Sequence, residues 1–433
     1  VLLAESAEDL QSMLDCAQAY AMKWRFRFNS SAGKSDVVII DPSGSSINPP
    51  TFRLGPATLG VATEYRYLGV GFGSPSSWKA YLQRVCTKAR IRMREIVYSA
   101  GGRAPLQIAT CVKLFKTLVR PILEYSSAVW SYHNAASRAL VDMDRILTDF
   151  GKRILRLQTQ ISSEYILREL GLERSEERAD RATLALFGRL CRMPEGRLAG
   201  HIFRARCSQV DAGQAPGSWC AHVKQLLDRE PGFHSVWAQR SPLRRWKSRV
   251  RQACSGYYTA RSEAEIAARS LGSLEAFARL GPSQTGNLLR TSMRDKGNRF
   301  RFRLRAGGVP LFWNVAASRP DLEDIEPENR WCRRCMEHKI READTAQHFL
   351  CSCLQSEHAR NLCLARISGA IDGLEAPQLR AAMLTTEGCF TLFLGDSLLG
   401  ELHPDVRRRV DKIICDFLRA AWKLREGDGW HID

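Results

Sequence analysis

The sequence lacks the features of membrane and secreted proteins. It contains no uninterrupted apolar run long enough to span a bilayer, and it does not begin with the charged, apolar and small-residue order of a signal peptide. Without a secretory signal, its 14 cysteines are not expected to form a disulfide framework. We therefore expect an intracellular chain with no membrane partner.

Several signatures of enzyme active sites are also missing. The chain has no Walker loop, no GxSxG, no HExxH and no dinucleotide-binding glycine motif. Asp142, Asp144 and Asp149 fall on a predicted helix, where their spacing does not converge on one metal ion. We interpret them as solvated acids, so the residues alone indicate no active site.

Acidic residues are in the minority. Lys and Arg number 64 against 46 acids, which gives a formal net charge of +18. An excess of this size favours a polyanionic partner, most commonly nucleic acid, although a scattered basic surface is the alternative. The 433 residues, 44% hydrophobic and 25% charged, are enough for two or three globular domains.

The apolar pattern indicates an α+β fold in which short strands come first and helices follow. Val1–Leu3 predict a buried strand that runs into a helix, and Ser6 with Asp9 resembles a capping box at the start of that helix. Short strands alternate with glycines up to about residue 72. From there to about residue 205 the spacing is helical, and Pro121 must end or kink one of the helices.

Two basic stripes are candidates for contact with nucleic acid. Arg84, Lys88 and Arg92 recur every four residues along a predicted helix, either as phosphate contacts or as a solvated face. In RFRFRLR, a strand would place four arginines on one face: Arg299, Arg301, Arg303 and Arg305. Alternating like charges repel one another, which favours an anionic ligand over an ordinary wet face.

Cysteines cluster only near the C-terminus. The pattern Cys332-x2-Cys335-x12-His348-x4-Cys353 supplies the soft and borderline ligands that zinc prefers. Chance clustering in a cysteine-rich chain is the alternative. A closed four-ligand site would be structural, because it leaves no position for water. The fourth ligand stays open, because Cys351 lies beside Cys353, and His358 and Cys363 follow shortly after.

Five segments together resemble the C-terminal part of a reverse transcriptase from a LINE-type (non-LTR) retrotransposon. In chain order they are VLLAESAEDLQSMLD, NSSAGKSDVVI, YRYLGVGF, LFKTLVRPILEYSSAVW, and LRAGGVPL followed by the cysteine cluster and HAR. The resemblance covers residues 1–130 and about 300–360. It implies a palm remnant over 1–72, a helical thumb over 73–205, a helical connector over 206–290 and a zinc-binding, nucleic-acid-binding domain over 291–433.

The resemblance also implies roles for individual residues. Lys34 matches a palm lysine, a candidate proton donor in catalysis, and Tyr67, Leu68 and Gly69 match a segment beside the primer grip. The family's x4 spacing favours Cys353 as the fourth zinc ligand. The aspartate pair that would hold Mg²⁺ in the intact parent enzyme is not found here, and we expect it to have preceded Val1.

The implied function is to hold RNA and DNA, as primer–template and element RNA, within an RNA-directed DNA polymerase. We expect this chain alone to be inactive, and we expect a nuclear location. The alternative is a non-catalytic zinc protein that binds nucleic acid, as a decayed or host-retained remnant of such an element.

Overall fold

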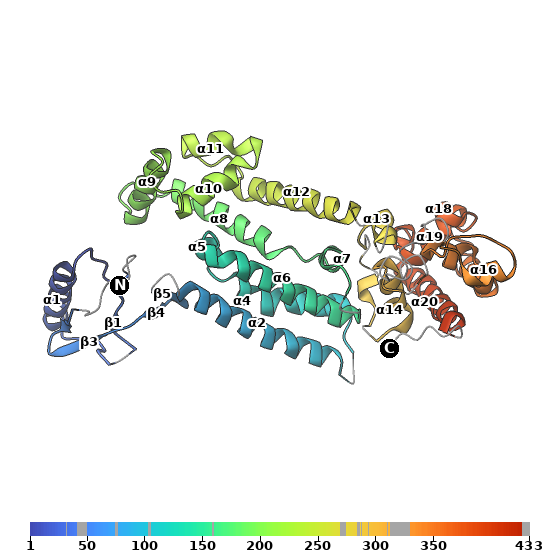
Figure 1. Ribbon diagram of the computed structural model, residues 1–433, viewed down its shortest axis with the longest axis horizontal. Coiled ribbons are helices and arrows are strands. Elements are labelled where there is room, and N and C mark those ends of the chain that lie inside the picture. The colour runs from blue at the N-terminus through green and yellow to red at the C-terminus, as the bar shows by residue number, and fades with distance from the viewer. Residues whose placement is uncertain are drawn as a thin grey trace.

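The protein is an elongated assembly of helices with two small sheets near one end (Figure 1). A computed structural model describes residues 1–31, 33–40, 50–73, 77–102, 105–157, 160–268, 274–283, 286, 288–292, 294–309, 311 and 330–426. The predicted α+β class is confirmed. No helix within these ranges is both long and apolar enough to cross a bilayer.

The N-terminal module packs one helix on a three-stranded sheet. Its elements are α1 (Ala7–Lys23), β1 (Asp36–Val37), β2 (Phe52–Leu54) and β3 (Ala57–Val61). The strand order is β1-β3-β2, with β1 parallel and β2 antiparallel to β3. The small core of this module comprises Leu14, Val37, Phe52, Leu54 and Leu59.

The start of the chain confirms one local prediction and contradicts another. The Ser6 side chain accepts a hydrogen bond from the Asp9 backbone N–H at 3.1 Å, so the predicted cap is present. Val1–Leu3, however, are exposed and form no strand. Three consecutive apolar residues predicted a buried strand here, but no described strand runs beside them to share backbone hydrogen bonds.

A β-hairpin connects this module to the helices. β4 (Glu64–Tyr67) pairs with β5 (Val70–Gly73) through a two-residue turn in which both Leu68 and Gly69 have positive φ, at 48° and 84°. Such turns match the twist of the strands they join. Tyr125 secures the turn, since its hydroxyl donates to the Leu68 carbonyl at 2.5 Å.

Long helices joined by short ones form the centre of the molecule. They are α2 (Ser77–Ala100), α3 (Ile108–Leu114), α4 (Arg120–Glu124), α5 (Ser127–Trp130), α6 (Asn134–Leu155), α7 (Ser163–Glu169) and α8 (Ser175–Cys191). The apolar face of α2 is buried, with Leu82, Ala89 and Met93 in the largest core beside residues of α6. A π-helical turn, η1 (Phe115–Val119), joins α3 to α4, and Pro121 lies in the first turn of α4. The regular α-helical hydrogen bonding is thus interrupted just before Pro121, as expected.

A second group of helices packs with part of α8 around a separate core. It contains α9 (Leu198–Asp211), α10 (Trp219–Asp228), η2 (Pro231–Phe233), α11 (His234–Gln239) and α12 (Trp246–Ala267). The boundary expected after residue 205 lies inside α9, and Phe203 and Cys207 on its two sides pack in this same core.

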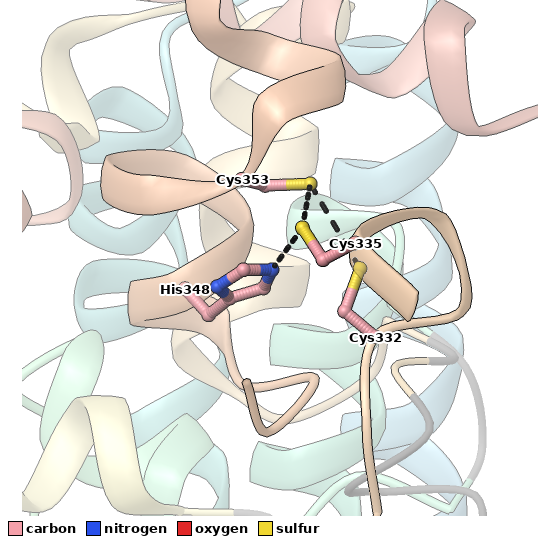
Figure 2. Close-up of side chains that lie close together, drawn as sticks. All are labelled: Cys332, Cys335, His348 and Cys353. Atoms are coloured by element: carbon pink, nitrogen blue, oxygen red, sulfur yellow. Dashed lines mark hydrogen bonds between the residues drawn. The ribbon is translucent and has the colours of Figure 1, made fainter. Parts of the chain in front are cut away.

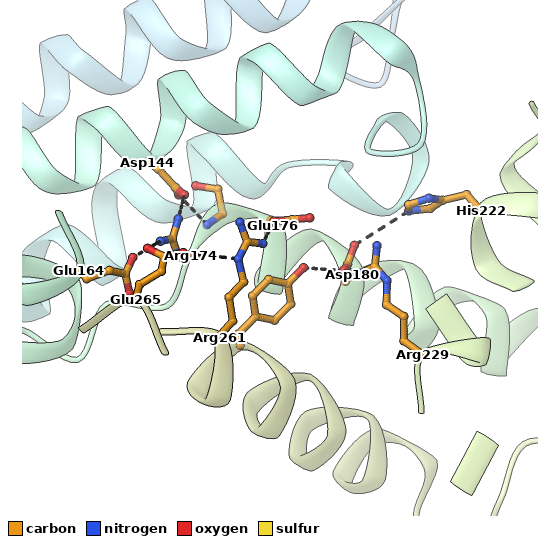
Figure 3. Close-up of polar contacts among 11 residues, drawn as sticks. Asp144, Glu164, Arg174, Glu176, Asp180, His222, Arg229, Arg261 and Glu265 are labelled. Atoms are coloured by element: carbon orange, nitrogen blue, oxygen red, sulfur yellow. Dashed lines mark hydrogen bonds and ion pairs between the residues drawn. The ribbon is translucent and has the colours of Figure 1, made fainter. Parts of the chain in front are cut away.

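Charged side chains connect α12 to α6, α7 and α8 (Figure 3). Arg174 lies among Asp144, Glu164 and Glu265, and its partner Glu164 accepts from the Ser262 hydroxyl at 2.5 Å. Burial raises the pKa of Asp180 to about 6, even though the Tyr258 hydroxyl donates to this carboxylate at 2.8 Å. The sequence analysis interpreted Asp144 as a solvated acid. The structure instead places its carboxylate in the ion-pair network around Arg174.

The C-terminal helices surround a third large core. They are α13 (Glu275–Leu280), η3 (Leu288–Arg290), α14 (Lys296–Arg305), α16 (Arg333–Glu337), η6 (His348–Ser352), η7 (Leu354–Ser356), α17 (Glu357–Ala370), α18 (Pro377–Ala382), α19 (Thr386–Leu394), η8 (Ser397–Leu399) and α20 (Pro404–Glu426). This core includes residues of α13, α14, α17, α19 and α20.

The segment RFRFRLR forms helix α14, and not the strand that would place its four arginines on one face. The Asp295 side chain caps this helix by accepting from the Asn298 N–H at 2.8 Å. On a helix, residues four apart share a side, so Arg301 and Arg305 point together into the protein. Arg301 pairs with Asp411 of α20 at 2.7 Å.

Arg305 is bonded to three separate elements. Its side chain is 1% exposed and pairs with the fully buried carboxylate of Glu169 on α7 at 2.7 Å. It also donates to the Leu394 carbonyl of α19 at 2.9 Å and to the Gly281 carbonyl after α13 at 2.6 Å. One guanidinium group thus connects the central helices to the C-terminal helices.

We predict that Arg305→Met destabilises the protein by about 3–5 kcal/mol, because it leaves the Glu169 carboxylate buried without its partner. Urea denaturation would measure this change. The double variant Arg305→Met/Glu169→Leu should recover most of the loss, since it removes both charges.

Lys296→Met is the matched control, because Lys296 is exposed on the same helix. Its effect should stay within about 0.5 kcal/mol. If Arg305→Met lowered the free energy of unfolding as little as the control does, the buried Arg305–Glu169 pair would not have the stabilising role assigned to it.

Candidate metal centre and basic surfaces

Four predicted ligands converge on one buried point. Cys332, Cys335, His348 and Cys353 are all buried, and one ligand atom from each lies within 4.8 Å of all the others (Figure 2). The Sγ of Cys353 lies 3.9 Å from each of the other two sulfurs, and the Sγ of Cys335 lies 3.3 Å from the Nε2 of His348. A tetrahedron with zinc–sulfur bonds of about 2.3 Å has edges of about 3.8 Å, so the four groups fit a zinc ion.

Local backbone structure produces this convergence. The Cys332 N–H donates to the Glu342 carbonyl at 2.7 Å, which folds the segment into a loop, and α16 begins directly after Cys332. The first turn of α16 then carries Cys335 to the same side. His348 and Cys353 lie at the two ends of a π turn, in which the Cys353 N–H donates to the His348 carbonyl at 2.7 Å. A π turn brings residues five apart together, which explains the x4 spacing.

Glu342 orients the histidine ligand, and the sequence analysis did not single it out. Its Oε2 lies 2.7 Å from His348 Nδ1, which leaves Nε2 facing the sulfurs. Such carboxylate–histidine contacts fix the ring and tautomer of metal-binding histidines. Burial opposes the charged imidazolium, but hydrogen bonds with Cys332 and Glu342 raise the pKa of His348 overall. The only signal in the sequence was an acid six residues before a candidate histidine ligand.

Cys351 lies outside this cluster. It packs against the C-terminal apolar core, and burial raises the pKa of its thiol to about 12. The geometry therefore brings Cys353, and not Cys351, to the other three ligands. Elsewhere in the ranges that the structure describes, no second group of three or more His, Cys, Asp or Glu side chains is arranged to hold a metal.

The two basic stripes have opposite environments. Arg84, Lys88 and Arg92 are exposed along α2, where Arg84 pairs with Glu64 and Arg92 pairs with Glu95. By contrast, Arg301 and Arg305 are buried in ion pairs within the protein. The expected arginine face over 299–305 is thus not a single exposed surface: Arg303 is buried and Arg299 is half-buried.

The palm-like residues lie in turns and at the end of a strand. Lys34 is exposed in a turn, and its carbonyl accepts from the Tyr65 hydroxyl at 2.9 Å. Tyr67 ends β4, and Leu68 and Gly69 form the hairpin turn that Tyr125 contacts. The hydrogen bond from Tyr125 thus joins two segments of the resemblance, YRYLG and RPILEY.

Arg120 and Glu124, from the thumb-like signature, belong to a structural network. Arg120 pairs with Glu124 and with Glu173, both at 3.2 Å, and Arg178 also bonds to both carboxylates. Arg181 completes the network at 2.6 Å from Glu173, an acid whose pKa these arginines lower against the opposing effect of burial. The network joins α4 to α8, so these signature residues stabilise the central helices.

Comparison with known proteins identifies one relative of this chain. No protein-family model and no solved structure matches it. The chain is 26% identical over 145 residues to the RNA-directed DNA polymerase from mobile element jockey of Drosophila funebris. The match includes 34% of this chain and spans 15% of that polymerase. It supports a relationship between this chain and the reverse transcriptases of LINE-type mobile elements.

Proposed function

We propose that this chain is the C-terminal portion of a retrotransposon RNA-directed DNA polymerase, and that it holds primer–template and element RNA. The similarity to the jockey polymerase carries this proposal. The order of the sequence motifs and the formal charge of +18 agree with it. In this proposal, the chain supplies binding surface, and the carboxylates that hold Mg²⁺ belong to a preceding segment.

The exposed face of α2 is the proposed duplex-binding surface. The helix carries six basic residues and one acid, and the stripe of Arg84, Lys88 and Arg92 runs along its exposed face. The ion pairs with Glu64 and Glu95 do not oppose this role strongly, because exposed ion pairs are worth only about 0–1 kcal/mol. Phosphate groups can therefore displace the carboxylates.

The Cys332, Cys335, His348 and Cys353 cluster is the proposed structural zinc site. All four positions are filled by protein ligands, so the ion would have no open position for a substrate. When bound, zinc would hold α16 against the π turn η6, and η6 contacts α17 and α19. The site would thereby stabilise the C-terminal domain and would perform no chemistry.

Changing Arg84, Lys88 and Arg92 together to Gln should weaken binding to every duplex sequence alike. Each lost phosphate contact removes about 0.9 from the slope of log affinity against log salt, so the slope should fall by about 2.7. Fluorescence anisotropy with an RNA–DNA duplex at several salt concentrations measures both effects.

The matched control changes Arg408, Arg409 and Lys412 to Gln. These three residues are exposed on α20, and the substitution removes the same charge. We expect the control to keep the wild-type slope. Equal effects of the two triple variants would mean that only net charge matters and that α2 is not the binding surface.

One zinc ion per chain should be found by metal analysis of the purified protein. Cys353→Ser should lose the ion, because it removes one of four ligands, whereas Cys351→Ser should retain it. Removing zinc should increase hydrogen exchange over residues 330–365 and leave α2 and α6 protected, since these two helices have a separate apolar core.

Loss of zinc from Cys351→Ser with retention by Cys353→Ser would reverse the ligand assignment. A wild-type protein without zinc would exclude the site.

Primer extension by this chain alone should give no nucleotide incorporation, because the proposal assigns the Mg²⁺-binding carboxylates to another segment. An RNA template with an annealed DNA primer is the substrate, and an active reverse transcriptase is the positive control. Incorporation above background would show that the carboxylates lie within this chain and that the proposed division is wrong.

A further inference from the structure

Aromatic and basic side chains alternate on the surface where helix α1 ends. All residues from Met22 to Asn29 are exposed, and their sequence is MKWRFRFN. Four cations and no acid occur between positions 16 and 35. We use the name aromatic platform for the set Tyr20, Lys23, Trp24, Arg25, Phe26, Arg27 and Phe28.

The rings of the platform form one continuous cluster. Tyr20 lies 6.0 Å from Trp24 and 6.1 Å from Phe26, and Phe26 lies 5.3 Å from Phe28, measured between ring centroids. Even so, Tyr20 is 58% exposed, Trp24 62%, Phe26 42% and Phe28 41%. Contiguous apolar surface that stays in contact with water marks an interaction site.

The backbone holds the platform against the end of the helix. The Phe26 N–H donates to the Ala21 carbonyl and the Arg25 N–H to the Met22 carbonyl, which together form a Schellman motif. Glycine usually occupies the left-handed position of this motif, but here Arg25 adopts it with φ of 55°. The chain thus keeps a cation among the rings at a position where glycine would be less strained.

We propose that the aromatic platform binds single-stranded nucleic acid. Unpaired bases would stack on the exposed rings, and Lys23, Arg25 and Arg27 would contact the phosphates. A duplex fits less well, because its base faces are already stacked inside the helix. This inference deepens the proposed function, since it assigns single strands to the platform and the duplex to α2.

The charges of the platform argue against a second copy of this chain as the partner. A symmetric contact would place the same three cations opposite one another, and like charges across an interface are unfavourable. A polyanion with flat apolar groups complements both the cations and the rings.

The test compares single-stranded and duplex binding by one variant. Trp24→Leu/Phe26→Leu/Phe28→Leu keeps an apolar surface and removes the aromatic faces. Anisotropy with a labelled oligo(dT) 20-mer should show affinity at least tenfold weaker than that of the wild type. Affinity for a duplex of the same length should stay within twofold.

Two further variants separate stacking from charge and from loss of apolar area. Lys23→Gln/Arg25→Gln/Arg27→Gln should lower the single-strand salt slope by about 2, at about 0.7 per contact. Leu384→Ala, which shortens an exposed apolar side chain elsewhere, should leave single-strand binding unchanged.

Wild-type affinity of the leucine variant for oligo(dT), or an equal loss on the duplex, would overturn the proposal. So would a dimer of the wild type in sedimentation velocity that the leucine variant loses, because the platform would then be a protein interface. The α2 variant reports on the duplex surface alone, so failure of either surface can be recognised separately.

Discussion

The burial of Arg305 constrains how the C-terminal helices fit against the central helices. A guanidinium group cannot lose its water unless its donors find acceptors, and here the acceptors come from the Glu169 carboxylate and from two carbonyls at helix ends. These three acceptors fix α7, α13 and α19 around α14. The C-terminal core therefore cannot rotate away from the central helices without separating Arg305 from Glu169 and breaking the hydrogen bonds of a buried guanidinium group.

Charge serves two purposes in this protein, and burial separates them. Around α4, α8 and α12, arginines and carboxylates form networks, in which Glu173 pairs with three arginines. On α2 and after α1, the basic residues remain exposed and outnumber acids. The formal charge of +18 is thus an incomplete measure of binding capacity, because part of the basic content stabilises the fold.

Local signals were sufficient where local geometry decides the outcome. Ser6 caps α1, helices α2 to α8 form where the residue spacing is helical, and the zinc-type spacing brings together four candidate ligands that lie within 22 residues of one another in the sequence. Residue alternation in RFRFRLR failed, because the partners that bury Arg301 and Arg305 lie 110 and 136 residues away. No pattern within the segment contains that information. Glu342 was missed for a related reason: only the folded loop brings it to His348.

The π turn between His348 and Cys353 has a consequence for how this centre tolerates changes in chain length. In a π turn, residues five apart lie one above the other, whereas in an α-helix residues four apart share a face. Deleting one residue inside the turn and converting it to an α-helical turn would keep the imidazole and the thiol on the same side. Ligand spacing and helix type can thus change together in related sequences while the centre itself is preserved.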